Sequence, residues 1–290
     1  MEEVLCRIGI ISDTHVGIQH DGGWNQPVWL GGEETLFPRL EQWRSANNVD
    51  FIIHCGDVAE PDSIEQGVRL LDSLGCPVAA VRGNHDIMQP IHYEGWRNEL
   101  SGSTNTQFGD SVFENEHCDV FLLNNQWFDA KNTAQWHWEV SPVGWLNSGQ
   151  LNWLDQSLSQ RDDKPAIVVV HYPLGIVPPY RIPPEFKKHN LEYERTLNEL
   201  FDRHERVKIV ASGHFHRTST QDLDKRLHLT TAAFSEAPFQ VRVLEIAHSR
   251  LNVRTEDLHQ RGDPVSPMPH KRFLNGDGKA YEVSNVSQAS

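Results

Sequence analysis

Side chains with oxygen and nitrogen donors follow five short apolar stretches of the sequence, each where a predicted strand ends. They are Asp13 and His15; Asp57; Asn84, His85 and Asp86; His171; and His214 and His216. Carboxylates, imidazoles and an amide oxygen, without suitable thiolates, favour metals such as Mn, Fe or Zn. Each short motif alone could be an ordinary polar turn, so their joint occurrence is what indicates a metal site. In an extended segment, His214 and His216 are expected to point the same way and reach one site.

The apolar stretches predict buried strands, and the segments between them have helical spacing. Strands are expected at residues 8–11, 51–54, 78–81, 120–123, 166–170 and 207–211, and helices at 33–44, 63–74, 148–160 and 191–204. This alternation is typical of a layered α/β domain, in which ligands bind at the carboxyl ends of the strands. After Ser219, short strands at 227–231, 240–246 and 251–254 are predicted to be antiparallel and to complete one edge of the core.

The composition indicates one globular domain. The chain has 290 residues, of which 38% are hydrophobic, enough for an ordinary core. We predict a single domain over residues 1–260 and an extended or mobile tail over 261–290, which is rich in Pro, Gly and Ser. The formal charge of −14 disfavours a nucleic acid polymer as partner. No membrane span or signal-peptide pattern is evident, and the four cysteines are widely spaced, which predicts a cytoplasmic location. A homo-oligomer is left open.

The order of the motifs, Asp-x-His, Gly-Asp, Gly-Asn-His-Asp, His and Gly-His-x-His, resembles the calcineurin-like metallophosphoesterase family over residues 13–216. The resemblance implies a four-layer αββα sandwich, which the strand pattern alone does not distinguish from a doubly wound sheet. It also implies two metal sites that share a bridging carboxylate. One metal would be held by Asp13, His15, Asp57 and His216, and the other by Asp57, Asn84, His171 and His214.

The mechanism that this resemblance implies needs no protein nucleophile. Two metal ions would activate a bridging hydroxide, which attacks phosphorus. His85 is expected to act as general acid towards the leaving group or to hold the phosphate, and Asp86 to orient His85 or to cap a turn. Within the family, the motifs are most similar to the class III branch of cyclic-nucleotide and glycerophosphodiester phosphodiesterases. Purple acid phosphatases are disfavoured because Glu60 stands where they carry a metal-binding tyrosine.

The substrate is predicted from less specific features. Candidate contacts for a small phosphate ester are Asn84, His85, His20, Trp24 and Tyr172. An aromatic-rich segment is expected to form a long loop that either binds the substrate or pins itself to the body of the protein. It contains Trp127, Phe128, Trp136, Trp138 and Trp145. A phosphodiesterase is the first hypothesis. The alternatives are a phosphomonoesterase, such as a nucleotidase or sugar phosphatase with the same site, and a non-catalytic metal-binding interaction module.

Overall fold

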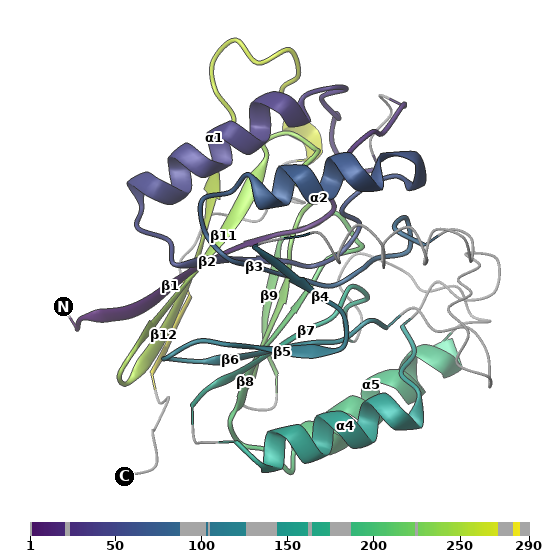
Figure 1. Cartoon of the computed structure of the whole chain (residues 1–290), viewed down its shortest axis with the longest axis vertical. Coiled ribbons are helices and arrows are strands. Elements are labelled where there is room, and N and C mark those ends of the chain that lie inside the picture. The colour runs from purple at the N-terminus through teal and green to yellow at the C-terminus, as the bar shows by residue number, and fades with distance from the viewer. Residues whose placement is uncertain are drawn as a thin grey trace.

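The protein is a sandwich of two mixed β-sheets with helices on both outer faces (Figure 1). The computed structural model describes residues 2–20, 24–87, 103, 105–125, 144–161, 164–174, 187–223, 226–271 and 281–284. Helices α1 and α2 cover one sheet, and α4 and α5 cover the other. The predicted four-layer αββα sandwich in a single domain is therefore confirmed.

The first sheet has the strand order β13-β12-β11-β1-β2-β3-β4. Its strands are β1 (Val4–Ile11), β2 (Phe51–His54), β3 (Val78–Ala80), β4 (Thr106–Phe108), β11 (Gln240–Ala247), β12 (Arg250–Asp257) and β13 (Tyr281–Ser284). Strands β1 to β4 run parallel, so their carboxyl ends lie along one edge of the sheet. β11 pairs with β1 in the antiparallel direction.

The second sheet has the strand order β5-β6-β7-β8-β10-β9. Its strands are β5 (Ser111–Glu114), β6 (Asp119–Leu122), β7 (Ala166–Val169), β8 (Val207–Ser212), β9 (Ser219–Leu223) and β10 (Arg226–Thr230). The inner strands β6, β7, β8 and β10 are parallel, and both outer strands are antiparallel to their neighbours. The predicted antiparallel strands at one edge of the core are confirmed for residues 240–246 and 251–254, which pair as β11 and β12. The prediction was wrong for residues 227–231, which belong to the second sheet. β9 turns the chain back in a hairpin, so β10 runs parallel to β8, in the other sheet.

The helices bury their apolar faces against the sheets. They are α1 (Glu33–Ala46), a 3₁₀ turn η1 (Pro61–Ser63) that leads into α2 (Ile64–Asp72), α4 (Ser148–Ser159) and α5 (Lys187–Phe201). Leu40 of α1 and Leu71 of α2 pack on the first sheet, and Leu154 of α4 and Leu197 of α5 pack on the second. A third cluster, which includes Ile10, fills the space between the sheets. These three apolar layers fix the strand ends relative to one another.

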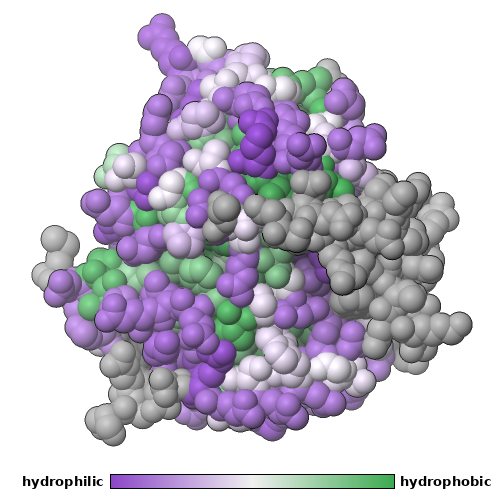
Figure 2. Space-filling view, viewed as in Figure 1, coloured by the Kyte–Doolittle hydropathy of each residue, from purple (hydrophilic) through white to green (hydrophobic). Residues whose placement is uncertain are grey.

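The face of the molecule in Figure 2 is mainly hydrophilic, and part of the C-terminal segment packs on the domain. Hydrophilic residues dominate the face seen in Figure 2, and apolar residues reach the surface between the two helical layers. Within the described residues, no helix combines the length and the apolar character needed to cross a bilayer. β13 of the predicted tail pairs with β12, and the Met268 backbone N–H donates to Gln26. The boundary at residue 260 stays a prediction.

Candidate metal centre

The predicted ligands all lie in loops that follow the carboxyl ends of parallel strands. Asp13 and His15 follow β1, Asp57 follows β2, Asn84 follows β3, His171 follows β7, and His214 and His216 follow β8. Backbone hydrogen bonds join the loops in pairs: the Asp13 N–H donates to the Gly56 carbonyl at 2.9 Å, and the Gly213 N–H donates to the His171 carbonyl at 3.0 Å. The two sheets therefore bring the loops to a common site.

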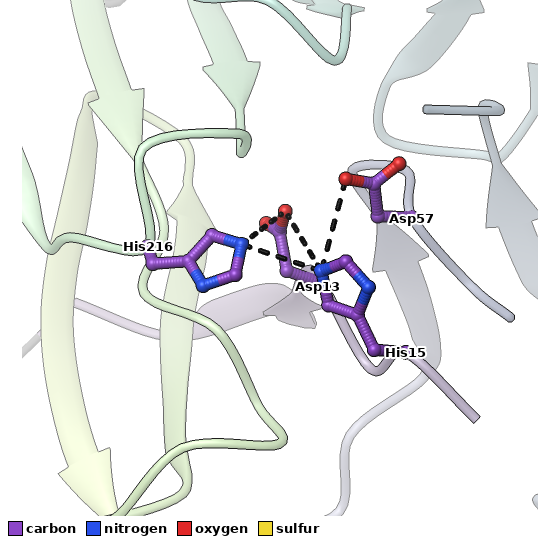
Figure 3. A group of neighbouring side chains, drawn as sticks. All are labelled: Asp13, His15, Asp57 and His216. Atoms are coloured by element: carbon purple, nitrogen blue, oxygen red, sulfur yellow. Dashed lines mark hydrogen bonds and ion pairs between the residues drawn. The ribbon is translucent and has the colours of Figure 1, made fainter. Parts of the chain in front are cut away.

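One group of donors consists of Asp13, His15, Asp57 and His216, which are all buried. Figure 3 shows their side chains pointing towards one another. Nε2 of His216 lies 3.2 Å from Oδ1 of Asp13 and 3.3 Å from Nε2 of His15. Nε2 of His15 lies 3.8 Å from Oδ2 of Asp57. Such a cluster of carboxylate and imidazole atoms has the composition of a transition-metal site.

A second group shares Asp57 with the first and adds His171 and His214. Nε2 of His171 lies 3.2 Å from Oδ2 of Asp57 and 3.0 Å from Oδ1 of Asn84. The structure thus brings together all the predicted ligands, in the same two groups that the motif resemblance implied. Asp57 is the member common to both groups, as a bridging carboxylate would be.

The hydrogen bonds behind the ligands show that these donor sets fit metal ions. Nδ1 of His15 donates to Glu60 at 2.9 Å, and Nδ1 of His216 donates to Glu236 at 3.0 Å. With Nδ1 as the donor, a neutral imidazole presents the lone pair of Nε2, so these two lone pairs face each other beside Asp13. Facing acceptors need a cation between them, and a carboxylate on the second ring nitrogen is typical of metal-ligating histidine.

The carboxylates of the site also favour protonation of two of its histidines. Burial opposes the charge, but Asp13 and Glu236 raise the pKa of His216 to about 10. Asp57 likewise outweighs burial and raises the pKa of His171 to about 9. The ion pair between His171 and Asp57 also affects the carboxylate. Burial alone would raise the pKa of Asp57, but His171 outweighs this effect and the pKa falls well below its ordinary value. The site is therefore built for positive charge next to its carboxylates.

The backbone at the ligands is unusual. Asp13, His15, Asp57, His214 and His216 have φ values of 52°, 43°, 54°, 68° and 49°, in the left-handed region. Such conformations cost on the order of 1–3 kcal/mol each and are concentrated at functional sites. The expectation that His214 and His216 lie in an extended segment was wrong, although both do reach the common site. Two left-handed residues curl the segment, and the two histidines belong to different donor groups.

A glycine allows the loops after β2 and β3 to approach closely. A Cβ atom on Gly83 would lie 2.1 Å from Oδ1 of Asp57 and 2.4 Å from its backbone nitrogen. No side chain fits there, because real Cβ contacts are not shorter than 3.0 Å. Gly83 therefore brings Asn84 and His85 within reach of Asp57.

His85 lies beside the shared carboxylate and outside both of these donor groups, in a third cluster of donor atoms with His15 and Glu60. Its backbone N–H donates to Oδ1 of Asp57 at 2.8 Å, and its Nδ1 lies 3.1 Å from Oε1 of Glu60. Its side chain is 24% exposed. Burial opposes protonation, yet Asp57 and Glu60 raise the pKa of His85 above its ordinary value. The imidazole is thus held by one nitrogen at the mouth of the site.

The comparisons with known proteins agree with this geometry. The family model described as Calcineurin-like phosphoesterase matches residues 6–218. The chain belongs to the calcineurin-like phosphoesterase family. This membership confirms that the protein is a metal-dependent phosphoester hydrolase. Relatives named as phosphodiesterases match the class III branch that the motifs resemble.

Two relatives and one solved structure are similar to this calcineurin-like phosphoesterase. The 3',5'-cyclic adenosine monophosphate phosphodiesterase CpdA of Escherichia coli is 26% identical over 237 residues, which cover 79% of this chain and 76% of that protein. The probable glycerophosphodiester phosphodiesterase GpdQ of Arcobacter nitrofigilis is 27% identical over 196 residues, or 63% of each chain. A dimetal phosphatase from Danio rerio shares the fold, with a TM-score of 0.65 and 16% identity over 92% of this chain and 98% of that one.

Asp86 and Tyr172 lie behind the ligands of this calcineurin-like site. The Asp86 carboxylate accepts hydrogen bonds from the backbone N–H groups of Gly83 at 2.7 Å and Ala59 at 3.0 Å, which matches the predicted capping of a turn. Burial, with the nearby Asp57, raises the pKa of Asp86 to about 7. Tyr172 is 2% exposed, and its ring lies 4.3 Å from that of His214. The catalytic role of Asp86 and the substrate contact of Tyr172 stay predictions.

Other predicted substrate contacts lie at the surface of the site. Trp24 is 40% exposed, and the ring of His20 meets it edge-on with the centroids 5.0 Å apart. Trp145 is 41% exposed as well, but it lines a different cavity, together with Leu151 of α4 and Thr196 of α5. The remaining members of the predicted aromatic loop, Trp127, Phe128, Trp136 and Trp138, lie outside the described residues.

Sequence reasoning missed two carboxylates that orient the ligands, Glu60 and Glu236. Glu60 follows the Gly-Asp motif by three residues and was considered only as a replacement for tyrosine. Glu236 lies in the segment between β10 and β11, is 3% exposed and contacts His216. No motif marks either residue. Glu60 could have been predicted, because it lies only three residues after Asp57 and therefore in the same loop after β2.

Proposed function

We propose that this calcineurin-like phosphoesterase hydrolyses small phosphodiesters, such as a cyclic nucleotide or a glycerophosphodiester, and that His85 is the general acid. The position of His85 supports the proposal most strongly. The imidazole is partly exposed and hydrogen-bonded to Glu60, while the ring of His15, 4.6 Å away, is buried among metal-ligand atoms. A histidine held by one nitrogen beside a metal centre is suited to proton transfer. The diester preference is supported by the activities named for the Escherichia coli and Arcobacter relatives.

The residues of the site have two roles in this proposal, metal binding and proton transfer. Asp13, His15, Asp57 and His216 would hold one metal ion, and Asp57, Asn84, His171 and His214 the other. When bound, the ions supply an activated water and offset charge on the phosphoryl oxygens. Glu60 binds Nδ1 of His85, so Nε2 is the nitrogen that donates a proton to the departing alkoxide. Asp57 orients the same residue by accepting its backbone N–H.

The first experiment identifies the reaction and the metal. Metal-stripped protein is reconstituted with Mn, Fe or Zn, and the hydrolysis of bis(p-nitrophenyl) phosphate is compared with that of p-nitrophenyl phosphate. A higher kcat/KM for the diester with at least one metal is expected. A preference for the monoester would replace the proposal with a phosphomonoesterase. Two bound metals without hydrolysis of either ester would favour the interaction module.

The second experiment tests the assigned roles. Asp57→Asn should lose metal and activity together, because the Asp57 carboxylate belongs to both donor groups. His85→Ala should keep its metals and lose about 10²- to 10⁴-fold in kcat on a diester with an alkyl leaving group, which needs a proton. The loss should be smaller on a p-nitrophenyl ester, since this leaving group departs without one. The exposed His248→Ala is the control. Wild-type turnover by His85→Ala on the alkyl ester would exclude the acid role.

We also propose a cytoplasmic location. The four cysteines are unpaired and buried, which fits a reducing compartment.

A further inference from the structure

We infer that Trp24 is a specificity-determining residue, whose indole forms an aromatic wall for a flat ring, such as a nucleobase, carried by the ester. The inference rests on the proposed function, since it concerns the substrate of the same site. It follows from the rings that surround Trp24, from its exposure and from the way its backbone is anchored.

Trp24 packs on histidines from three different loops of the metal centre. Its ring centroid lies 4.5 Å from that of His15, with the planes tilted by 30°. The His216 ring is also 4.5 Å away, and the His85 ring is 5.4 Å away; both meet the indole nearly at right angles. One indole therefore touches two proposed metal ligands and the proposed general acid.

The exposure of Trp24 separates it from its neighbours. His15 and His216 are 1% and 5% exposed, whereas Trp24 keeps 40% of its surface in solvent. Burying an aromatic ring is favourable, so an indole left open directly above buried polar ligands is a ready contact for another apolar surface. Its nearness to His85 puts this contact on the side where the leaving group would receive its proton.

The backbone of Trp24 is fixed by Glu236. The Glu236 carboxylate accepts hydrogen bonds from the backbone N–H groups of Trp24 at 2.8 Å, Asn25 at 3.1 Å and Gln26 at 2.7 Å. The same carboxylate binds Nδ1 of His216. The Asn25 side chain adds bonds to the carbonyl groups of residues 215 and 216, at 2.7 and 2.9 Å. The wall is thus anchored to a metal ligand, which lowers the entropic cost of binding a ring against it.

Stacking on one aromatic side chain suits a planar ring and discriminates little among such rings. The inferred class of substrate is therefore a diester with a nucleobase or another flat aryl group, in preference to a purely aliphatic one such as a glycerol diester. Binding can be measured apart from catalysis, because a phosphomonoester product binds to the same site. Adenosine 5'-monophosphate carries a base where ribose 5-phosphate carries a hydroxyl group.

The test measures the dissociation constants of these two ligands by calorimetry on the metal-loaded protein. Wild-type protein should bind adenosine 5'-monophosphate about tenfold more tightly than ribose 5-phosphate, as one stacked base provides. Trp24→Ala should lose this ratio, while Trp24→Phe should keep most of it. Leu30→Ala, which removes a 43% exposed apolar side chain from the same segment, should behave as wild type. Metal content is measured for every variant. If Trp24→Ala binds less metal than wild type, the ratio of the two dissociation constants in Trp24→Phe is used to judge the role of the ring.

The outcomes distinguish this inference from the proposed function. Equal binding of both ligands by wild-type protein, or an unchanged ratio in Trp24→Ala, would overturn the role of Trp24 while leaving phosphodiester hydrolysis intact. If neither ligand binds to the metal-loaded protein, the phosphate site itself is wrong and the inference fails with it. A ratio that falls in Trp24→Ala, while Leu30→Ala keeps the wild-type ratio, is the result that we expect.

Discussion

Oε1 of Glu60 accepts a hydrogen bond from Nδ1 of His15 at 2.9 Å. Burial opposes ionisation, but hydrogen bonds from His15 and His85 lower the pKa of Glu60 to about 2, so the group is a carboxylate at neutral pH. We expect Glu60→Ala to weaken metal binding about 10- to 100-fold, because carboxylates behind ligating histidines have effects of this size. Titration of the metal-stripped variant with Mn, followed by calorimetry, measures the change.

The control for this prediction is Glu65→Ala, which removes an exposed acid from α2 and should bind metal as wild type does. Glu60→Gln should fall between wild type and Glu60→Ala, since an amide oxygen still accepts one hydrogen bond. Unaltered metal affinity in Glu60→Ala would mean that His15 is oriented by packing alone.

Gly83→Ala tests the close approach of two loops. The added methyl group would overlap the Asp57 carboxylate, at 2.1 Å, and cannot move away because the backbone nitrogen of Asp57 lies 2.4 Å from it. We expect a loss of metal binding and a decrease of about 1–3 kcal/mol in the free energy of unfolding, as overpacking gives. Urea denaturation and metal analysis provide the two measurements.

Gly75→Ala is the matched control, because its added methyl group would meet the flexible end of the Glu41 side chain at 2.9 Å. This variant should keep both its metals and its stability to within a few tenths of a kcal/mol. A stable, metal-binding Gly83→Ala would show that the loop after β3 can move away from Asp57.

The inner parts of the fold could be predicted from sequence, and the sheet edges could not. The strands that sequence analysis missed are β4, β5, β9 and β13, which are the four outer strands of the two sheets. An inner strand such as β7 is fully buried and reads as a continuous apolar run. β9, in contrast, has the sequence Ser-Thr-Gln-Asp-Leu and no buried residue. Such a strand is held by backbone hydrogen bonds to its neighbour, and these do not produce an apolar pattern in the sequence.

The same division applies to the metal centre. Ligands follow strands at short distances in sequence, so Asp13 and Asp57 could be found as motifs. Glu236 reaches His216 from a segment that no motif marks, so nothing in the local sequence distinguishes it from other acids. Backbone curvature at His214 and His216 was also unpredicted, because left-handed φ values at histidine are imposed by the surrounding structure.

Metal binding should release protons. In the metal-free protein His171 and His216 have pKa values of about 9 and about 10, so both rings are charged at pH 7. A ligating imidazole must be neutral, so below these pKa values the metal affinity should rise with pH, by up to about tenfold per pH unit for each proton released. Calorimetric titration with Mn at pH 7, in two buffers of different ionisation enthalpy, counts the protons. A heat of binding that does not depend on the buffer would contradict the prediction.

His54 should make stability depend on pH. Burial lowers its pKa from 6.5 to about 3. Nδ1 accepts the Gly56 N–H at 3.2 Å, so Nε2 carries the proton and donates to Thr14 at 3.0 Å. Because the folded pKa is depressed, the stabilisation is complete above about pH 6.5 and is lost as pH falls towards 3. Between pH 7 and 5 the loss is about 2 kcal/mol.

His54→Gln removes this dependence. In metal-free protein, the fall in unfolding free energy from pH 7 to pH 5 should be about 2 kcal/mol smaller in His54→Gln than in wild type. Urea denaturation at both pH values measures it, and the difference is independent of any overall destabilisation by the substitution. His248→Gln, at an exposed histidine, is the control. An equal fall in wild type and His54→Gln would mean that His54 is charged inside the folded protein. The Gly56 N–H would then need another acceptor.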